Sequence, residues 1–260
     1  MPGPTPSRGR TGRPPRTSRA QILEAAWRLI DRDGWQKLTM RRLAAEAGAA
    51  PTTLYHHVRD RDDLLTQLLD DYAARVPRPE LPEDPQERIV AAATAMHDSL
   101  AAWPWIVEVL TAGDFMGDSA LWMVESIVQG AVDCGCTPEQ AVDLYRSLWY
   151  YTAGEILVRA GTARRRAERE EREGREGNEG REGNEGDAAS SGFSAYDESV
   201  RRRLAGSGLP HLSGLADRWP RLVTRETYPE GLRAFVDGLL SHARGAARNA
   251  RGAPRNPRQG

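Results

Sequence analysis

Apolar side chains between residues 18 and 75 recur every three or four positions, in short runs that end at a glycine or a proline. Ser18-Arg19-Ala20-Gln21 is a capping box, which typically opens a helix, and Gly34 closes the same run. The apolar stripe of this first helix is Ile22, Ala26, Leu29 and Ile30. A later helix, which Asp60 is placed to cap, carries Leu64, Leu65, Leu68 and Leu69. The pattern predicts a three-helix unit followed by a connecting helix.

Between these two helices, the segment 38–65 predicts two short helices joined by a tight turn at Gly48. Thr39 can cap the first helix, Gly48 supplies a left-handed turn, and Pro51 suits the first turn of the second helix. Leu54 and Val58 are expected to point inward. The side chains left outside are Thr52, Thr53, Tyr55, His56 and His57, with Arg59 and Arg61 after them. An ordinary helical hairpin fits this pattern, but hydroxyls, rings and cations on one side favour a helix-turn-helix that reads a DNA major groove.

The second half of the chain is helical in pattern from Asp84 onward, after a proline-rich boundary at 76–82 that no helix is expected to cross. Helices are predicted at 84–102, from Pro104 to about Gly113, and at 118–134, 138–165 and 229–248. The last of these carries a wide apolar stripe of Leu232, Phe235, Val236, Leu239 and Leu240. One side of the stripe is expected to pack on the core, and an outward part that includes Leu240 to pair with a second copy.

Three segments are predicted to have no packed structure. Residues 1–17 are rich in proline, glycine and arginine, so they are expected to form a disordered basic arm, either a solvated tail or an arm that contacts DNA phosphates or the minor groove. Residues 164–200 are expected to be a mobile insertion, and 249–260 a disordered tail. Within the insertion, the repeat at 175–186 has a glycine every third residue, each costing about 1 kcal/mol in a helix, although charge pairs in 164–173 can prolong the preceding helix.

Composition adds a charge asymmetry to this picture. The formal net charge is −1, yet residues 1–60 hold eleven basic and five acidic side chains, so the remainder is acidic. A basic end suits contact with nucleic acid. No segment approaches the roughly 20 apolar residues of a membrane span, and the N-terminus lacks the apolar core of a signal peptide, so a cytoplasmic protein is expected.

Candidate catalytic and metal-binding chemistry is absent from the sequence. Cys134 and Cys136 are the only cysteines, which excludes a disulfide framework and a four-ligand zinc site and predicts two inert thiols. His56 and His57 are adjacent, so in a helix they diverge by about 100° and cannot easily chelate one ion. With no nucleophile–base pair and no phosphate-binding glycine loop, we expect no enzyme, no metal and no cofactor.

The stretch AAWRLIDRDGWQKLTMRRLAAEAGAAPTTLYHHVRDRDDLL resembles the DNA-binding domain of the TetR (tetracycline repressor) family of transcriptional regulators. Its most specific part is TLYHHV, followed by a basic residue and then D-L-L. LWYYTAGEILV and YPEGLRAFVDGLL are similar to the last large helices of the family's ligand-binding domain. The resemblance implies an all-α fold, with a three-helix helix-turn-helix DNA-binding domain and connecting helix at 18–75 and a larger helical effector-binding and dimerisation domain at 84–248.

The resemblance also implies DNA contacts at particular positions. Tyr55, His57 and Arg61 match positions that usually touch phosphates. Positions at or beside the base edges are matched by Arg41, Pro51, Thr52, Thr53 and His56. Thr39, at the start of the first short helix, completes the candidate set. Because Ala50-Pro51-Thr52 offers no long amide or cation, base readout is expected to depend on Arg41, Thr53 and His56, with threonine methyls against thymine methyls.

The aromatic side chains of the second half are either core residues or walls of a cavity, and the resemblance favours a pocket for a small effector. Candidates by face and helix are Met96, His97, Leu100, Trp105, Phe115, Met123, Trp149, Tyr150 and Glu155. The function implied is a ligand-responsive regulator, expected to be a repressor, that binds a two-fold operator as a homodimer. A sequence-tolerant DNA-binding protein without a small-molecule effector is the alternative.

Overall fold

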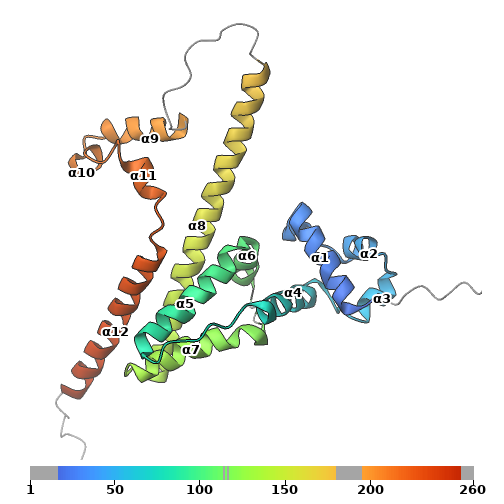
Figure 1. Ribbon diagram of the computed structural model, residues 1–260, viewed down its shortest axis with the longest axis horizontal. Helices are drawn as coiled ribbons and strands as arrows, with labels where there is room; N and C mark the ends of the chain where they lie inside the picture. The colour runs from blue at the N-terminus through green and yellow to red at the C-terminus, as the bar shows by residue number, and fades with distance from the viewer. Residues whose placement is uncertain (1–16, 114, 116, 180–194, 253–260) are drawn as a thin grey trace, which may run out of the picture. The chain divides into compact units, whose positions relative to one another are not determined.

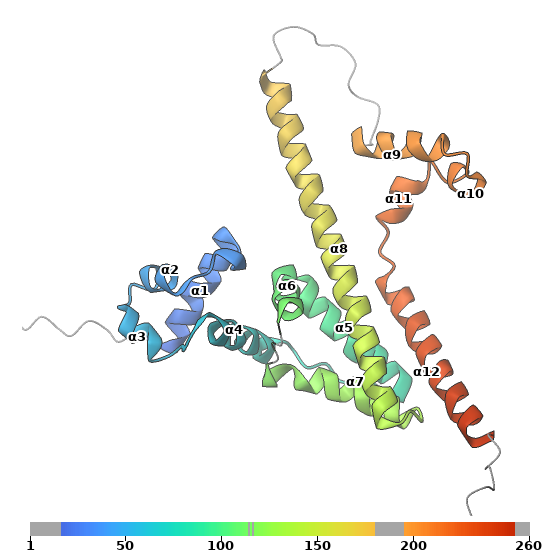
Figure 2. The same ribbon diagram turned by 180° about the vertical axis from the view of Figure 1, so that it is seen from behind.

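The computed structural model describes residues 17–113, 115, 117–179 and 195–252, and every regular element in these ranges is helical (Figures 1 and 2). The all-α fold expected from the sequence is thereby confirmed. The chain divides into two compact units. The first comprises Met1–Glu80 with Ser99–Glu125, and the second comprises Leu81–Asp98 with Ser126–Gly260.

The first unit contains the predicted three-helix arrangement and its connecting helix. Its elements are α1 (Arg19–Asp33), η1 (Trp35–Lys37), α2 (Met40–Glu46), α3 (Pro51–Tyr55), α4 (Arg61–Arg75), the end of α5 (Pro85–Ala101), α6 (Pro104–Ala112), η2 (Asp118–Ala120) and the start of α7 (Leu121–Asp133). The capping box at Ser18 is present, since its side chain accepts from the Gln21 N–H and the Gln21 side chain accepts from the Ser18 N–H. Gly34 ends α1 with a φ of 85°.

A single apolar core joins α1, α2, α3 and α4. Its fully buried side chains come from each of these helices in turn: Ile22, Leu43, Leu54, Leu64, Leu65 and Leu68. Each helix contributes one face to this core, and the apolar residues of that face recur every three or four positions, as the sequence pattern predicts. Because α3 is only five residues long, it depends on this packing rather than on its own helix propensity.

The second unit is built around two long helices, α8 (Pro138–Glu179) and α12 (Tyr228–Gly252), which lie side by side (Figures 1 and 2). Leu148 and Ile156 of α8 are buried, as are Leu232 and Val236 of α12. The helices approach closely at Gly231, where a side chain would collide with the Tyr151 hydroxyl. The rest of the unit contains most of α5, most of α7, and three helices between α8 and α12.

The expectation that Leu240 belongs to an outward part of the α12 stripe is wrong. Leu232, Val236 and Leu240 are all buried within their own chain, with Leu240 only 1% exposed, and Phe235 and Leu239 are half-buried. Besides packing on α8, α12 contacts α5 through the Gln86–Asp237 hydrogen bond and the Glu87–Arg233 ion pair, so it uses more than one row of side chains within its own unit. The stripe therefore does not by itself require a second copy.

The expectation that the glycine-rich insertion is non-helical is also wrong as far as Glu179, where α8 ends. Extending an existing helix avoids the nucleation penalty, and the sequence places opposite charges four residues apart, such as Arg164 and Glu168. These terms offset the glycines at 174 and 177. Residues 180–194, which include the rest of the repeat, lie outside the described residues.

Other expected segments differ in extent. α9 (Ala195–Ala205), α10 (Pro210–Ser213) and α11 (Trp219–Val223) follow the insertion and were not predicted, and α9 overlaps the range 164–200. α12 reaches Gly252, so the tail expected at 249–260 is helical at its start. The expected basic arm at 1–17 lies outside the described residues except for Thr17.

A buried pair of hydroxyls joins the two long helices. Thr152 of α8 is fully buried, and its Oγ1 lies 2.8 Å from the Oη of Tyr228, which begins α12. Burial raises the pKa of Tyr228 to about 12, so the phenol stays protonated and available for hydrogen bonding. This pair fixes the register of α12 on α8.

We expect Tyr228→Phe to lower the free energy of unfolding by about 1–3 kcal/mol, because the Thr152 hydroxyl would be left buried without a partner. Thermal and denaturant unfolding would measure the change. Tyr55→Phe, measured without DNA, is a matched control, because the Tyr55 side chain is 55% exposed and no residue that the structure describes forms a hydrogen bond with its hydroxyl. Equal stabilities of the two variants would contradict the role given to the hydroxyl pair.

Candidate DNA-binding surface and effector site

The turn between α2 and α3 is built by local contacts of the residues that predicted it. Thr39 caps α2, since its Oγ1 accepts from the Arg42 N–H at 3.3 Å. Gly48 has a φ of 61°, and the next N–H, of Ala49, donates to Ala44 O at 3.0 Å. Pro51 occupies the first turn of α3. The backbone of the helix-turn-helix therefore follows from caps, one glycine and one proline.

The candidate DNA-contacting side chains of α3 lie on its outer face. Leu54 and Val58 are 1% exposed and anchor the segment to the core. Pro51, Thr52, Tyr55 and His56 are exposed, and Thr53 and His57 are half-buried. Tyr55, at 55% exposure, is a large ring that the fold leaves in solvent. A surface of hydroxyls and rings on a short, anchored helix is suited to contact bases and phosphates.

Arg41 and Arg42 of α2 have different surroundings. Arg42 forms an ion pair with Asp33 and donates to Lys37 O at 3.0 Å, so it ties α2 to the end of α1. Arg41 is exposed, and no residue that the structure describes forms a hydrogen bond or ion pair with it. Of these two arginines, Arg41 is the one whose guanidinium is available to DNA.

Arg61, which the resemblance assigns to a phosphate contact, is engaged within the unit. Its Nε donates to Leu38 O and its Nη2 to Trp35 O, both at 3.1 Å, and its guanidinium lies over the Trp35 ring at 5.1 Å. These contacts fasten the first turn of α4 to the segment before α2. A phosphate contact through the remaining donors stays a prediction.

Two side chains that the sequence reasoning missed support the same surface. Gln67 of α4 donates to His57 O at 3.0 Å, and its Oε1 accepts from Arg19 Nε of α1 at 2.7 Å. Glu46 at the end of α2 accepts from Arg28 at 3.2 Å and from Arg32 at 3.1 Å. Those hydrogen bonds lower the pKa of Glu46. A glutamine or glutamate on a helical surface carries no sequence signal for such a bridge.

The effector candidates fall in both units. Leu100, Trp105, Phe115 and Met123 belong to the first unit, and Met96, His97, Trp149, Tyr150 and Glu155 belong to the second. Met96, Leu100 and Met123 are buried apolar side chains, Phe115 and Trp149 are half-buried, and the Tyr150 ring is exposed. Trp105 packs edge-on against Trp27, with ring centroids 5.2 Å apart.

Two of these candidates meet in the second unit. His97 Nε2 lies 3.0 Å from Glu155 Oε2, and the His97 ring stacks on Tyr228 at a centroid distance of 3.8 Å. Tyr151 stacks on the same tyrosine at 5.4 Å, and Arg159 bridges Glu155 and Glu226. Tyr228 and Tyr151 were missed because only the packing of α12 on α8 brings them beside His97. The cluster combines aromatic faces with charged hydrogen-bonding groups, as small-molecule sites do.

Residues 22–68 match the family described as "Bacterial regulatory proteins, tetR family", and residues 78–243 match "Tetracyclin repressor-like, C-terminal domain". The chain belongs to the TetR family. Between them, the two matches cover both the helix-turn-helix and the helices that follow it.

Relatives and solved structures agree with this assignment. The HTH-type transcriptional repressor DrrR1 of Streptomyces coeruleorubidus is 31% identical over 159 residues, 58% of this chain and 56% of the relative. The match to an HTH-type transcriptional regulator of Saccharopolyspora erythraea is also 31% identical and covers 46% of this chain and 52% of the relative. The chain thus spans about half the length of these relatives.

The fold is shared with ActR from Streptomyces coelicolor. Apo ActR has a TM-score of 0.63 at 20% identity, covering 89% of this chain and 98% of ActR. ActR in complex with actinorhodin has a TM-score of 0.60 at 23% identity, with 88% and 98% covered. At these identities the likeness establishes the fold alone.

Within the described ranges, no helix combines the length and the apolar character that a membrane span requires. Within the same ranges, no three or more histidine, cysteine, aspartate or glutamate side chains gather as ligands for a metal ion.

We expect Arg61→Ala and Arg61→Lys both to lower the free energy of unfolding, by about 1–3 kcal/mol, because neither side chain can bond to both carbonyls and stack on Trp35. Thermal unfolding without DNA would measure this. Arg41→Ala, which removes an exposed and unpaired guanidinium, should leave the stability unchanged. If Arg61 serves only as a phosphate contact, the lysine variant will be as stable as the unsubstituted protein.

Proposed function

We propose that the protein is a transcriptional regulator that binds a two-fold DNA operator as a homodimer and responds to a small molecule. The observation that carries the DNA-binding part is the anchored helix α3, with its outward hydroxyls and rings beside the unpaired guanidinium of Arg41. Phosphate contacts would come from Tyr55 and His57 and would position the helix. Base contacts would come from Arg41, Thr53 and His56 and would specify the sequence. Thr39, Pro51 and Thr52 flank those contacts.

Two observations support the two-fold assembly. On α8, Tyr150 and Val158 are 61% and 67% exposed, and Gly154 lies between them. On α12, no atom lies within 4 Å of where a side chain at Gly238 would begin. An exposed apolar row beside an open helix face suits a contact between helices of two copies. A dimer would also double the base contacts that one short recognition helix provides.

We place the effector site at the cluster of His97, Glu155 and Tyr228. His97 and Glu155 keep part of their side chains exposed and could hydrogen-bond a polar group of the ligand, whereas the buried Tyr228, stacked with His97 and Tyr151, supports the His97 ring. The ligand would act by favouring one of two placements of the DNA-binding domains within the dimer. α4 follows the helix-turn-helix and precedes α5 in the chain. It is the element through which ligand binding would change the placement of the DNA-binding domains. A protein that binds DNA without sequence preference or effector is the second candidate.

Sequencing the DNA fragments retained by the purified protein would test the proposal most directly. We expect an enriched sequence with two-fold symmetry. Competition with random duplex at fixed salt separates this result from sequence-tolerant binding, because the phosphate contribution is the same for both duplexes. Recovery of unrelated fragments would support the second candidate.

For individual contacts, we expect Tyr55→Phe to weaken binding to matched and mismatched duplexes by similar factors, because a phosphate contact carries no sequence information. Arg41→Ala should instead change discrimination at one base pair by about 1–3 kcal/mol. Titrations of each variant with both duplexes measure these effects, with Arg203→Ala of α9 as the control for a lost surface charge. Unchanged discrimination in Arg41→Ala would remove this residue from base readout.

For assembly, we expect Gly238→Arg to give a folded monomer, because a Cβ at this position meets no atom beyond its own helix, whereas the added side chain would occupy the helix face proposed to be paired. Light scattering at micromolar concentration would measure the mass, and circular dichroism the helix content. Gln129→Arg, on the exposed side of α7, is the control for an added arginine. A monomeric mass for the unsubstituted protein, or a dimeric mass for Gly238→Arg, would refute this interface.

A further inference from the structure

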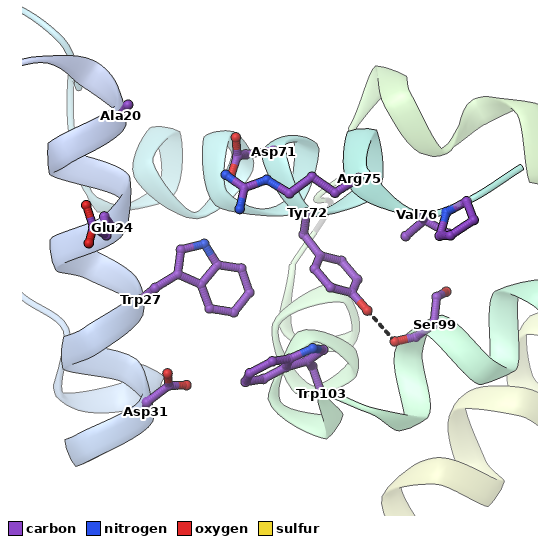
Figure 3. A pocket seen from close by; sticks show the side chains of 11 residues that line it. Ala20, Glu24, Trp27, Asp31, Asp71, Tyr72, Arg75, Val76, Ser99 and Trp103 are labelled. Carbon is purple, nitrogen blue, oxygen red and sulfur yellow. Dashed lines mark hydrogen bonds and ion pairs between the residues drawn. The ribbon is translucent and has the colours of Figure 1, made fainter.

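A cleft of about 720 Å³ lies within the first unit, between α1, α4 and the corner that joins α5 to α6 (Figure 3). Its lining residues are Ala20, Glu24, Trp27, Asp31, Asp71, Tyr72, Arg75, Val76, Pro77, Ser99 and Trp103. None of them is a candidate from the sequence, and none belongs to the cluster around His97. The volume is in the range of known small-molecule sites.

The cleft follows from a second face of α1. Ala20, Glu24, Trp27 and Asp31 recur at spacings of three and four, so they form one row along the helix. The opposite face of α1 carries the buried Ile22 row. α4 contributes Asp71 and Arg75 at four-residue spacing, and the α5–α6 corner contributes Ser99 and Trp103. The sequence thus leaves one side of α1 polar and aromatic where an ordinary surface helix would be only polar.

Contacts among the rings hold the three walls together. Trp27 lies edge-on to Trp103 at a centroid distance of 5.4 Å and 6.1 Å from Tyr72. The Tyr72 hydroxyl donates to Ser99 O at 2.5 Å (Figure 3). Trp27, Tyr72 and Trp103 are each half-buried. Their exposed parts therefore form an aromatic surface that is already ordered before any ligand binds, which reduces the entropy lost on binding.

The charges around this aromatic surface are mainly negative. Three carboxylates and one guanidinium line the cleft, and Arg75 is paired with Asp71, with Nη2 2.6 Å from Oδ2. Glu24 makes a 3.2 Å contact with Arg28, an exposed pair on the same helix that stabilises little. Asp31 has no hydrogen bond or ion pair with any residue that the structure describes. The α1 side of the cleft thus keeps an excess of negative charge.

We propose that this cleft binds an organic cation that carries aromatic or bulky apolar groups. The faces of Trp27, Tyr72 and Trp103 attract a cation through their ring quadrupoles and cover its apolar groups. Asp31 and Glu24 add charge attraction from α1. An anion of the same shape meets the carboxylates and the negative ring faces, so it is excluded by the same groups.

Tetraphenylphosphonium and tetraphenylborate test this proposal, because they have nearly the same size and shape and opposite charge. Calorimetric titration of the full-length protein in sodium buffer, without DNA, would measure both dissociation constants. We expect the cation to bind at least tenfold more tightly than the anion. The readout does not involve DNA, so its outcome is independent of the function proposed above.

Substitutions of the residues that line the cleft test whether the cation binds there. We expect Asp31→Asn to weaken tetraphenylphosphonium binding about threefold, and the double variant Glu24→Gln, Asp31→Asn about tenfold. Trp103→Leu should also weaken it, by about fivefold or more. Asp143→Asn, which removes an exposed carboxylate of α8 outside the cleft, is the matched control and should bind as the unsubstituted protein does. Thermal unfolding of each variant verifies that it is folded.

Three results would overturn the proposal. Equal affinity for the two ions would show that the cleft recognises apolar shape and not charge. Undiminished cation binding by the folded double variant and by Trp103→Leu would place the cation elsewhere. Failure of tetraphenylphosphonium to bind at millimolar concentration would show that the aromatic surface is no cation site.

Discussion

The packing of α1 against α2 and α4 is the constraint on which the first unit depends. Ile22 on α1 and Leu64, Leu65 and Leu68 on α4 are all buried in one core, and α3 is too short to be stable without it. Gln67 and Arg61 add polar ties from α4 to the segments on either side of the recognition helix. The same packing turns the second face of α1 toward Tyr72, which is why a single helix contributes both to the core and to the cleft.

Local signals in the sequence were sufficient to predict the helix-turn-helix. Caps at Ser18 and Thr39, the left-handed Gly48 and the proline at the start of α3 each act within a few residues, so they can be interpreted without knowing the fold. The outward side chains of α3 follow from the two buried positions Leu54 and Val58. The DNA-contacting roles of those side chains came from the family resemblance and remain proposals.

Contacts between distant segments could not be predicted in this way. His97, Glu155 and Tyr228 come from three helices, and their meeting depends on how α12 packs on α8. Arg61 illustrates a different difficulty, because a charged residue at the start of a helix looks free in the sequence while the fold directs it to two carbonyls. In α8, the low helix propensity of glycine predicts a break, but the helix continues to Glu179 because extending a long stable helix avoids the cost of nucleation.

The width of an apolar stripe is a poor measure of what covers it. Leu232, Val236 and Leu240 are covered by their own chain, so these three side chains of the α12 stripe are not available to a partner. The surface that we propose for a second copy instead includes Gly238 of α12, where a Cβ would meet no atom beyond its own helix, and Val158 of α8. Small residues leave no hydrophobic signal in a sequence, yet they permit the closest approach of two helices. The dimer contact that we propose is therefore argued from the exposed side chains of α8 and the empty space on α12, and not from the apolar stripe of α12.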